Sequence, residues 1–394
     1  MSNPGAASAG LRPFSAWDGP RQPRIVLVGE AWGTTEAMLR LPFAGQSGME
    51  LWRMLGEAAG PQAFGEAHAR ACAAMRYEAA WVRSRGEWME AQGLAFTNVF
   101  NLQPAGNKIE SLCETKKTNR KADPAWQLAR AQYLKAEHWP HVERLAAELE
   151  AARPNLIVAL GNTACWALLR ATNIGSIRGG ITAGSAAGVA PGRKVLPTYH
   201  PAGVLRQWSW RPIVVADLMK AWRQAGFAEV RRPQRLVTIN PSLAELEAYV
   251  ATLEAHPPPR LSVDIETGQN QIKCIGFAAN RAQAFVVPFV DLEHSSGSYW
   301  GSPSEERKAW ACVARLLALP SAKVFQNGVY DLQYITQLGM LPRACTEDTM
   351  LLHHSLYPEL PKGLGFLGSI YTEEPAWKLM RKQKAAEAMT KADE

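Results

Sequence analysis

The sequence predicts an α/β fold arranged in two domains. Short apolar runs that read as buried strands, such as Ile25 to Val28, end in glycine and open into loops. The chain has 394 residues, of which 47% are hydrophobic and 20% charged, so it is long enough to bury two cores. The amino-acid composition changes near residue 228, and the following segment, Arg231-Arg232-Pro-Gln-Arg235, reads as a linker. We therefore expect a flexible terminus at 1–20, a first domain at 21–227, a linker and helix at 228–260, and a second domain at 261–394.

The first predicted strand leads into a loop that carries a carboxylate. Ile25 to Val28 is β-branched and apolar, and Gly29 and Gly33 allow the following backbone to turn tightly. Open α/β sheets bind ligands at the carboxyl ends of their strands, so Glu30 stands where a side chain would meet a substrate. A helix-capping glutamate on a solvated turn is the alternative, and the segment taken alone favours that alternative.

Two later predicted strands end in the same way. Asn98 follows Ala95-Phe-Thr97, and its amide offers a donor and an acceptor that suit the edge of a pyrimidine. His200-Pro201 follows another strand-like run that begins at Lys194. Three polar side chains are therefore expected at the carboxyl ends of strands.

Five segments in a fixed order carry a resemblance to a known family. They are Gly29-Glu-Ala-Trp-Gly33, Leu41-Pro-Phe-Ala-Gly45, Thr97-Asn98, Ala159-Leu-Gly-Asn-Thr-Ala164 and His200-Pro201. Over about residues 20 to 225 this set resembles the uracil-DNA glycosylase superfamily, most closely the branch called family 4. The resemblance implies a three-layer domain with a parallel central sheet, and hydrolysis of the N-glycosidic bond of uracil in DNA.

The resemblance also assigns roles to individual residues. Glu30 matches the acidic position that orients or activates water, and His200 the group that stabilises negative charge on the departing base. Asn98 matches the amide that reads uracil. Phe43 matches the aromatic residue that stacks on the extruded base, and Ala31 lies in the substrate-binding loop.

The chain departs from the family at two places. Trp32 replaces the proline of the first loop, which puts the shape of that loop in question. Family 4 enzymes hold an iron–sulfur cluster with four cysteines, whereas Cys72, Cys113 and Cys165 here lack ligand spacing, and His138-Trp-Pro140 stands near a later ligand position. We expect no iron–sulfur cluster, with helix packing taking over its structural role.

Charge favours DNA as the partner. The net charge of +7 fits a polyanion, whether single- or double-stranded. Lys116 and Lys117 open a compact basic run that would clamp phosphate, and a solvated surface loop is an equally good interpretation. Trp208-Ser-Trp210-Arg211 is either a stacking platform or the anchor of the next helix, and we favour packing.

Composition also bears on the compartment. Six cysteines without a pairing pattern suggest a reducing environment. No long apolar run reads as a membrane span, and the first residues lack the blocks of a signal peptide. We expect a soluble, cytoplasmic protein of a bacterial cell or a phage-infected host, with no membrane partner.

The second half opens with a capped helix and an acidic strand. Ser242 is expected to cap a helix over 243–253. In Leu261-Ser-Val-Asp-Ile-Glu-Thr267, Asp264 and Glu266 are two apart and so point to the same face of a strand. Two like charges there are costly without a cation, which favours a metal site, and a solvated edge strand is the alternative.

A third carboxylate follows the next expected strand, Lys323 to Phe325. The sequence predicts a helix start that places Asn327 and Asp331 on one face. Carboxylates from a strand and a helix could then converge on a divalent metal ion.

Together these segments resemble the 3′–5′ proofreading exonuclease domain of family A DNA polymerases, whose motifs are Asp-x-Glu and Asn-x-x-x-Asp. The segments Thr346 to Leu352 and Leu360 to Leu367 resemble the stretch between the second and third motifs of the phage enzymes. The resemblance covers about residues 230 to 380. It implies a ribonuclease H-like (DnaQ-like) α/β fold and Mg²⁺ or Mn²⁺ ions held by Asp264, Glu266 and Asp331.

Other polar residues of this half have structural interpretations. Asp348 is expected to be a helix cap, and His353-His354 to be packing and surface. The family's final Tyr-x-x-x-Asp motif has no match after Tyr371. We therefore expect the front of a longer polymerase-type chain, or one half of a split protein with a polymerase module as partner.

These observations predict uracil removal from DNA, coupled to an exonuclease-like domain that binds DNA 3′ ends in a phage-like replication system. Two other functions stay open. One is a non-catalytic module that senses uracil or positions a polymerase, and the other is a 3′–5′ exonuclease whose first domain is a scaffold.

Overall fold

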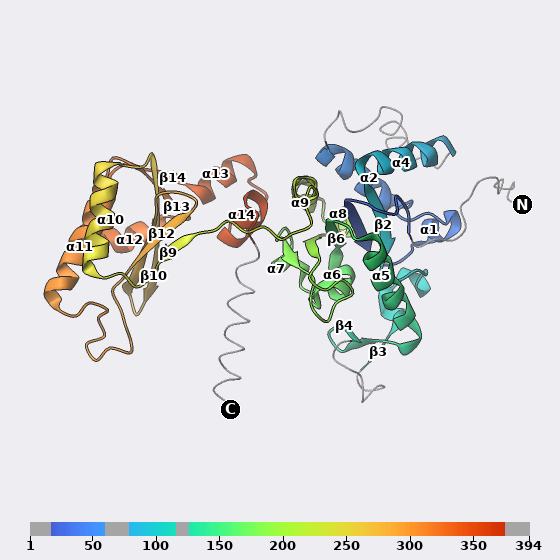
Figure 1. Cartoon of the computed structure of the whole chain (residues 1–394), viewed down its shortest axis with the longest axis horizontal. Helices are drawn as coiled ribbons and strands as arrows, with labels where there is room; N and C mark the ends of the chain where they lie inside the picture. The colour runs from blue at the N-terminus through green and yellow to red at the C-terminus, as the bar shows by residue number, and fades with distance from the viewer. Residues whose placement is uncertain (1–16, 60–78, 116–125, 375–394) are drawn as a thin grey trace, which may run out of the picture. The chain divides into compact units, whose positions relative to one another are not determined.

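The computed structural model describes residues 17–59, 79–115 and 126–374 (Figure 1). Contacts divide the chain into two compact units. Unit 1 comprises Met1–Arg231 and Gly368–Glu394, and unit 2 comprises Arg232–Leu367. The basic run at 116–121 and most of the terminus expected to be flexible lie outside the described residues.

Unit 1 is built on a five-stranded sheet in the order β2-β1-β6-β8-β7. The strands are β1 (Ile25–Gly29), β2 (Leu94–Asn98), β6 (Leu156–Leu160), β7 (Thr182–Ala183) and β8 (Lys194–Thr198). The first four in the order pair in parallel, and β7 pairs antiparallel with β8. Every residue of these four parallel strands is buried, as expected when helices cover both faces of a sheet.

Helices make the outer two layers of unit 1 (Figure 1). They are α1 (Thr34–Leu39), α2 (Gln46–Ala59), α4 (Ala79–Gln92), α5 (Trp139–Ala152), α6 (Gly161–Leu169), α7 (Ile174–Ile177), α8 (Pro201–Arg206) and α9 (Arg211–Gln224). Ile25 and Leu27 join a cluster with α2, α4 and α9, while Val26 and Val28 join one with α5 and α6. Alternate residues of the strand thus pack into two separate cores, one on each face of the sheet. This confirms the predicted three-layer α/β domain.

A small sheet and four 3₁₀ turns are the other regular elements in the described part of unit 1. They are β3 (Cys113–Thr115), β4 (Gln127–Ala129), β5 (Gln132–Leu134), η2 (Ala105–Asn107), η3 (Ile109–Leu112), η5 (Ala136–His138) and η6 (Trp208–Trp210). At the start of α5, Trp139 stacks on Trp126 with ring centroids 4.6 Å apart. The Arg170 guanidinium lies 5.9 Å from the Trp139 ring centroid and 4.9 Å from that of Trp166. Aromatic packing therefore fixes this end of α5, beside His138.

Unit 2 holds a six-stranded sheet in the order β14-β13-β10-β11-β12-β9. The strands are β9 (Leu236–Thr238), β10 (Arg260–Gly268), β11 (Gln271–Ala278), β12 (Gln283–Pro288), β13 (Ala322–Phe325) and β14 (Cys345–Asp348). Strands β10, β11 and β12 form an antiparallel meander, and β13 and β14 then add in parallel on the other side of β10. This is a ribonuclease H-like arrangement, as predicted.

The helices of unit 2 are α10 (Leu243–Ala255), α11 (Pro303–Ala318), α12 (Val329–Gln337), α13 (Thr349–Leu356) and α14 (Leu364–Tyr371), the last of which runs into unit 1. Ser242 caps α10 in a capping box with Glu245, so the predicted start of this helix is confirmed. On β10, Leu261, Val263 and Ile265 are buried and the intervening residues are exposed.

Two expectations for polar residues are confirmed in unit 2 and one is wrong. Asp348 caps α13, accepting bonds from the backbone N of Met350 at 2.8 Å and of Leu351 at 3.3 Å. His353 is buried and His354 exposed. Asn327, however, does not open α12. Its backbone is left-handed, with φ of 60°, and its N–H donates to Asp348, so the helix begins two residues later at Val329.

Residues 368–374 cluster with unit 1, although the sequence suggested the second domain. Lys220 Nζ donates to the carbonyl oxygens of Gly179 at 2.7 Å, Ser369 at 2.6 Å and Thr372 at 2.6 Å. A buried ammonium thereby satisfies carbonyls near the end of α14. None of the helices in the described part of the chain is long and apolar enough to cross a bilayer.

Candidate active site at the carboxyl ends of the strands

Asn98 and Phe43 converge on Gly29 at the end of β1. Gly29 pairs with Asn98 in the sheet. A Cβ atom on Gly29 would lie 2.7 Å from Phe43 Cζ and nearer still to Asn98 Oδ1, so only glycine allows this approach. The Phe43 ring packs on Phe96 with centroids 5.1 Å apart, and its backbone is left-handed with φ of 52°. Two of the residues predicted to bind the base therefore lie together.

The loop that carries Phe43 is braced by a glutamate that sequence reasoning missed. Glu36 is 8% exposed, and its Oε1 accepts from the backbone N of Gly45 at 2.8 Å. A Cβ atom on Gly33 would lie 2.5 Å from Glu36 Oε2, and one on Gly45 would lie 2.9 Å from Oε1. Gly33 and Gly45, which lie on either side of Glu36 in the sequence, are the features from which this contact could have been predicted.

Glu30 follows β1 and is held by the start of α6. Thr163 donates its hydroxyl to Glu30 Oε2, and the backbone N of Phe100 donates to Glu30 O at 2.9 Å. Burial raises the pKa of Glu30, and the charge of Glu110 adds to the rise, while the Thr163 bond and Arg206 oppose it. Gly33, rather than Glu30, is the N-cap residue of α1, so Glu30 does not cap that helix.

His200 is fixed as a neutral hydrogen-bond donor. It is the N-cap residue of α8, and its Nδ1 accepts from the backbone N of Ala202 at 3.2 Å. Burial, with the charge of Arg206, lowers the pKa of His200 to about 4. A neutral ring that accepts at Nδ1 carries its proton on Nε2, so this bond assigns the tautomer.

The turn before α6 is shaped for the same histidine. Gly161 has φ of +81°, and a Cβ atom there would lie 2.9 Å from His200 Cβ. Glycine is therefore required at this point for two reasons, backbone conformation and close approach. Helix α6 thus touches His200 through Gly161 and Glu30 through Thr163.

Helix α5 is hydrogen-bonded to the end of β2, the strand that carries Asn98. Arg144 Nη2 donates to the carbonyl oxygens of Asn98 at 2.6 Å and Val99 at 3.0 Å. Its Nη1 donates to Glu148 Oε2 at 2.6 Å, and Thr97 donates to the same oxygen at 2.9 Å. No sequence signal pointed to Arg144, because its partners lie 45 and 46 residues away along the chain.

The remaining residues of the predicted site have different outcomes. Trp32 is 1% exposed, and its backbone N donates to Leu102 O at 3.0 Å, a bond that the family's proline cannot make. Ala31 is half-buried and packs against the core beside α5 and α6. Lys116 and Lys117 lie outside the described residues.

The predicted metal ligands of unit 2 are close enough to influence one another. Burial raises the pKa of Asp331 to about 6, with the charges of Asp264 and Asp348 adding to the rise. Burial and the charge of Glu266 raise the pKa of Asp264. Asp331 Oδ1, however, accepts from the backbone N of Ile265 at 3.0 Å.

These side chains do not form a ligand set in this structure. In the part of the chain that the structure describes, no group of three or more His, Cys, Asp or Glu side chains is placed to hold a metal ion. The present geometry therefore does not fit a bound divalent ion, and we derive no chemical step through one.

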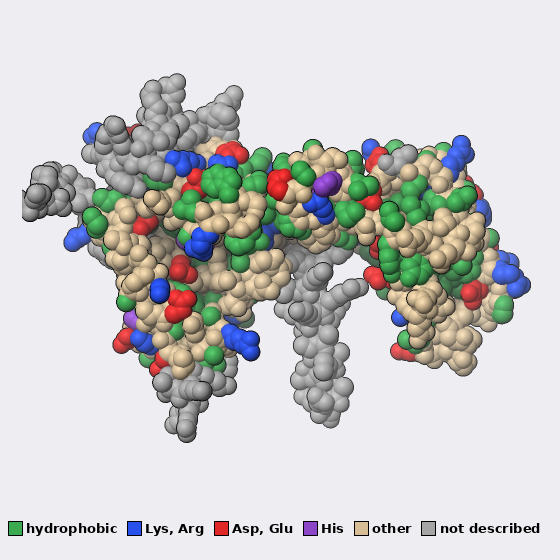
Figure 2. Space-filling view, turned by 180° about the vertical axis from the view of Figure 1, so that it is seen from behind, with side chains coloured by type: hydrophobic (Ala, Val, Ile, Leu, Met, Phe, Trp, Pro, Cys, Tyr) green, Lys and Arg blue, Asp and Glu red, His purple; other side chains and the backbone are tan. Residues whose placement is uncertain are grey.

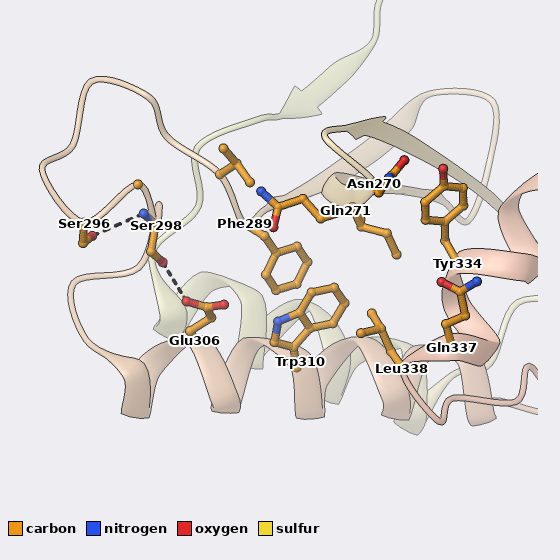
Figure 3. Close-up of a pocket in the computed structure, with 13 residues that line it drawn as sticks. Asn270, Gln271, Phe289, Ser296, Ser298, Glu306, Trp310, Tyr334, Gln337 and Leu338 are labelled. Carbon is orange, nitrogen blue, oxygen red and sulfur yellow. Dashed lines mark hydrogen bonds between the residues drawn. The ribbon is translucent and has the colours of Figure 1, made fainter.

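A separate pocket of about 500 Å³ opens in unit 2 (Figure 3). Phe289 and Trp310 lie face to face in it with ring centroids 3.5 Å apart, and Gln271 and Gln337 add amides. Of the described residues that line it, none is lysine or arginine, and Asp331 is not among them. The described lining therefore offers aromatic and amide side chains without a basic one, and it does not include Asp264, Glu266 or Asp331.

Apolar side chains also reach the surface of unit 2. On α13, Leu351, Leu352 and Leu356 are between 55% and 67% exposed. Figure 2 shows hydrophobic side chains gathered on the face that it presents. Exposed apolar groups of this size are common at interaction surfaces.

Several solved structures are similar to parts of the chain. Escherichia coli RNase D, an exoribonuclease involved in structured RNA processing, is 14% identical with a TM-score of 0.25, covering 35% of this chain and 33% of RNase D. The EXD2 exonuclease domain soaked in Mn and GMP is 18% identical with a TM-score of 0.24, covering 34% of this chain and 68% of that one. The catalytic core of RRP6 from Trypanosoma brucei is 19% identical with a TM-score of 0.22, covering 35% and 34%.

The chain thus spans about a third of the RNase D and RRP6 structures, and these scores are too low to assign an activity. A comparison with curated proteins found no match.

The family comparison concerns the unit whose sheet carries Glu30, Asn98 and His200 at or just after the ends of β1, β2 and β8. The description "Uracil DNA glycosylase superfamily" matches residues 16–225, which is more than half of the chain and includes all five segments that carry the resemblance. The chain therefore belongs to the uracil DNA glycosylase superfamily.

Proposed function

We propose that unit 1 hydrolyses the N-glycosidic bond of uracil in DNA. The observation that carries this proposal is the convergence of Asn98, Phe43, Glu30 and His200 at one edge of the sheet, through Gly29 and Gly161. Carboxylate, neutral imidazole, amide and ring are the groups that base excision needs.

Recognition of the base falls to Phe43 and Asn98. Extruding a nucleotide costs a few kcal/mol, and stacking with edge hydrogen bonds recovers that cost. The amide of Asn98, 3% exposed and held through its own backbone by Arg144, presents a donor and an acceptor to a pyrimidine edge. The Phe43 ring supplies an apolar surface beside the same glycine.

Bond cleavage falls to Glu30 and His200. When the sugar–base bond breaks, its electron pair leaves with the base, and the neutral His200 donates from Nε2 to the base oxygen where charge collects. A water molecule adds to the sugar carbon and gives its proton to the Glu30 carboxylate, whose Oε2 is oriented by Thr163. The departing base then takes up a proton, so that the products are free uracil and an abasic site.

A weaker activity is proposed for unit 2. Burial, and then neighbouring negative charge, raises the pKa of Asp264 and of Asp331, and an added Mg²⁺ or Mn²⁺ ion would favour their ionised forms. Unit 2 would then bind DNA 3′ ends and show little exonuclease activity, because the described residues lack a complete ligand set. A polymerase module would supply the rest.

Substitutions at the catalytic residues separate an enzyme from a binding module. Glu30→Gln and His200→Ala should each slow uracil release, His200→Ala by about 100- to 1,000-fold, because one preorganised donor is lost. Affinity for a uracil-containing strand should change little. Asn98→Asp should also reduce release, since it replaces the amide donor by a carboxylate.

If the wild type binds the strand but releases no uracil, the non-catalytic module is correct. If it shortens the strand without leaving abasic sites, the exonuclease with a scaffold domain is correct.

A further inference from the structure

The two tryptophans that follow α8 have opposite environments. Trp210 stacks on Tyr199 with ring centroids 4.1 Å apart and an interplanar angle of 12°, and a Cβ atom on Gly203 would lie 3.1 Å from its ring. Trp208, two residues earlier, is 59% exposed. Packing, which we expected for the whole segment, therefore explains Trp210 and leaves Trp208 unexplained.

Trp208 is exposed but supported from behind. The Arg211 guanidinium lies over its ring, 5.6 Å from the centroid. Arg211 is itself fixed by two carboxylates, Glu50 Oε1 at 2.8 Å and Glu57 Oε2 at 2.6 Å. A cation–π contact with an immobilised guanidinium limits the motion of the indole and leaves its other face available to a ligand.

The exposed ring lies close to the proposed active site. Helix α8 runs from His200, its N-cap residue, to Arg206, and six helical residues span about 9 Å. The charge of Arg206 reaches both catalytic groups, since it lowers the pKa of Glu30 and of His200. Trp208 lies two residues after Arg206. Nucleotides of one strand are about 3.4 Å apart, so we expect Trp208 to lie within a few nucleotides of the extruded base.

The segment between His200 and Trp208 also carries a free cation. Arg206 is exposed, and within the described ranges it has no ion-pair partner. Leu205, next to it, is 44% exposed. A cation and a supported aromatic face on one short segment are the two elements with which proteins bind single-stranded nucleic acid.

We infer that Trp208 stacks on an unpaired base next to the excised nucleotide and that Arg206 contacts the intervening phosphate. In a duplex, neighbouring bases stack on each other and offer no free face, so this contact selects single-stranded or locally opened DNA. The inference rests on the proposed function, because it extends the substrate of the same site.

The test compares Trp208→Ala with the wild type on uracil-containing single strands. KM should rise about 5- to 150-fold, the range expected for loss of one base–aromatic stack, and kcat should change little. Trp208→Phe should recover most of it. On a strand in which both neighbours of uracil are abasic, wild type and Trp208→Ala should be equal, because no base is left to stack. Met219→Ala, at a residue of α9 that is 46% exposed, is the matched control and should behave as wild type.

Direct binding keeps the inference separate from the glycosylase activity. Fluorescence anisotropy with oligothymidylate and with an abasic strand of equal length measures stacking without catalysis. Trp208→Ala should weaken only the first, and Arg206→Gln should reduce the salt dependence of both by about one phosphate contact.

If the wild type releases no uracil while the differences in binding appear, the proposed function fails, and the stacking of Trp208 on single-stranded bases stands without it. Equal KM and equal affinity for Trp208→Ala and wild type overturn the inference. So does a wild type that does not bind single strands.

Discussion

At the scale of single residues, the protonation state of His200 decides how the site would work. Its Nδ1 is committed to the backbone N of Ala202, and its pKa of about 4 leaves the ring neutral at physiological pH. A neutral donor stabilises developing negative charge without first having to take up a proton.

The first prediction follows from this state. Uracil release should rise with pH as Glu30 ionises and should then show no fall up to pH 8, because His200 is already neutral above its pKa of about 4. The measurement is kcat from pH 4 to 9. A fall in kcat with a midpoint near 6.5, the unperturbed value for histidine, would show that the charged imidazole is the active form.

The second prediction concerns Thr163. Its hydroxyl bond lowers the pKa of Glu30, so Thr163→Val should raise that pKa and move the acid limb of the kcat profile to higher pH. Thr163→Ser keeps the hydroxyl and should leave the limb in place. An acid limb that does not move in Thr163→Val would mean that Glu30 is not the titrating group.

At the scale of elements, helix α5 acts as a clamp on the end of β2. Arg144 donates to the backbone carbonyl oxygens of both Asn98 and Val99, so it holds the backbone from which the Asn98 side chain projects.

The third prediction tests the clamp. Arg144→Gln should reduce kcat by about 10-fold or more, because small displacements of a positioning group are costly in catalysis. Arg153→Gln is the control at the C-cap of the same helix, since Arg153 is exposed and pairs with Glu150 at 2.8 Å. Far-ultraviolet circular dichroism should show that both variants are folded. Equal kcat in the two variants would show that Arg144 does not position Asn98 for catalysis.

Elements with strong local signals could be predicted from the sequence. The apolar run of β1, the alternation of β10 and the Ser242 cap each depend on neighbouring residues, and all three are confirmed. The start of α12 was misplaced because Asn327 has a left-handed backbone, with φ of 60°, in a turn whose N–H donates to Asp348, 21 residues farther along the chain. Such tertiary competition leaves no mark in local sequence.

The candidate site could also be predicted only in part. The positions of its polar groups at the strand ends follow from the parallel topology, but the side chains that hold those groups in place could not be predicted. Arg144 and Glu36 act through partners that only the folded chain brings near. The contrast between Trp208 and Trp210, two residues of one 3₁₀ turn, likewise depends on Tyr199 and Gly203.

At the scale of the whole molecule, the two units differ in how complete their sites are. Unit 1 holds Glu30, Asn98 and His200, three of the groups proposed for the glycosylase, at or just after the carboxyl ends of its parallel strands, with Phe43 next to Asn98. In unit 2 the carboxylates of Asp264, Glu266 and Asp331 influence one another without forming a ligand set among the described residues.

The fourth prediction is that metal binding by unit 2 is weak and separable from unit 1. Millimolar Mn²⁺ should raise the thermal unfolding midpoint of the wild type slightly, because a cation stabilises the ionised carboxylates of Asp264 and Asp331, whose pKa values are raised by burial and then by neighbouring negative charge. Asp264→Ala should abolish the shift and Glu30→Gln should retain it. A large shift at micromolar Mn²⁺ would contradict the incomplete site.

The most direct test of the central claim, a metal-independent glycosylase in unit 1, is base release in a chelator. The purified chain is incubated with a 5′-labelled uracil-containing single strand, with either EDTA or Mg²⁺, and the products are resolved with and without alkaline cleavage of abasic sites. We predict abasic sites at uracil in both conditions, at similar rates, and little shortening of the strand. Loss of all uracil release in EDTA, or strong Mg²⁺-dependent shortening without abasic sites, would contradict the account.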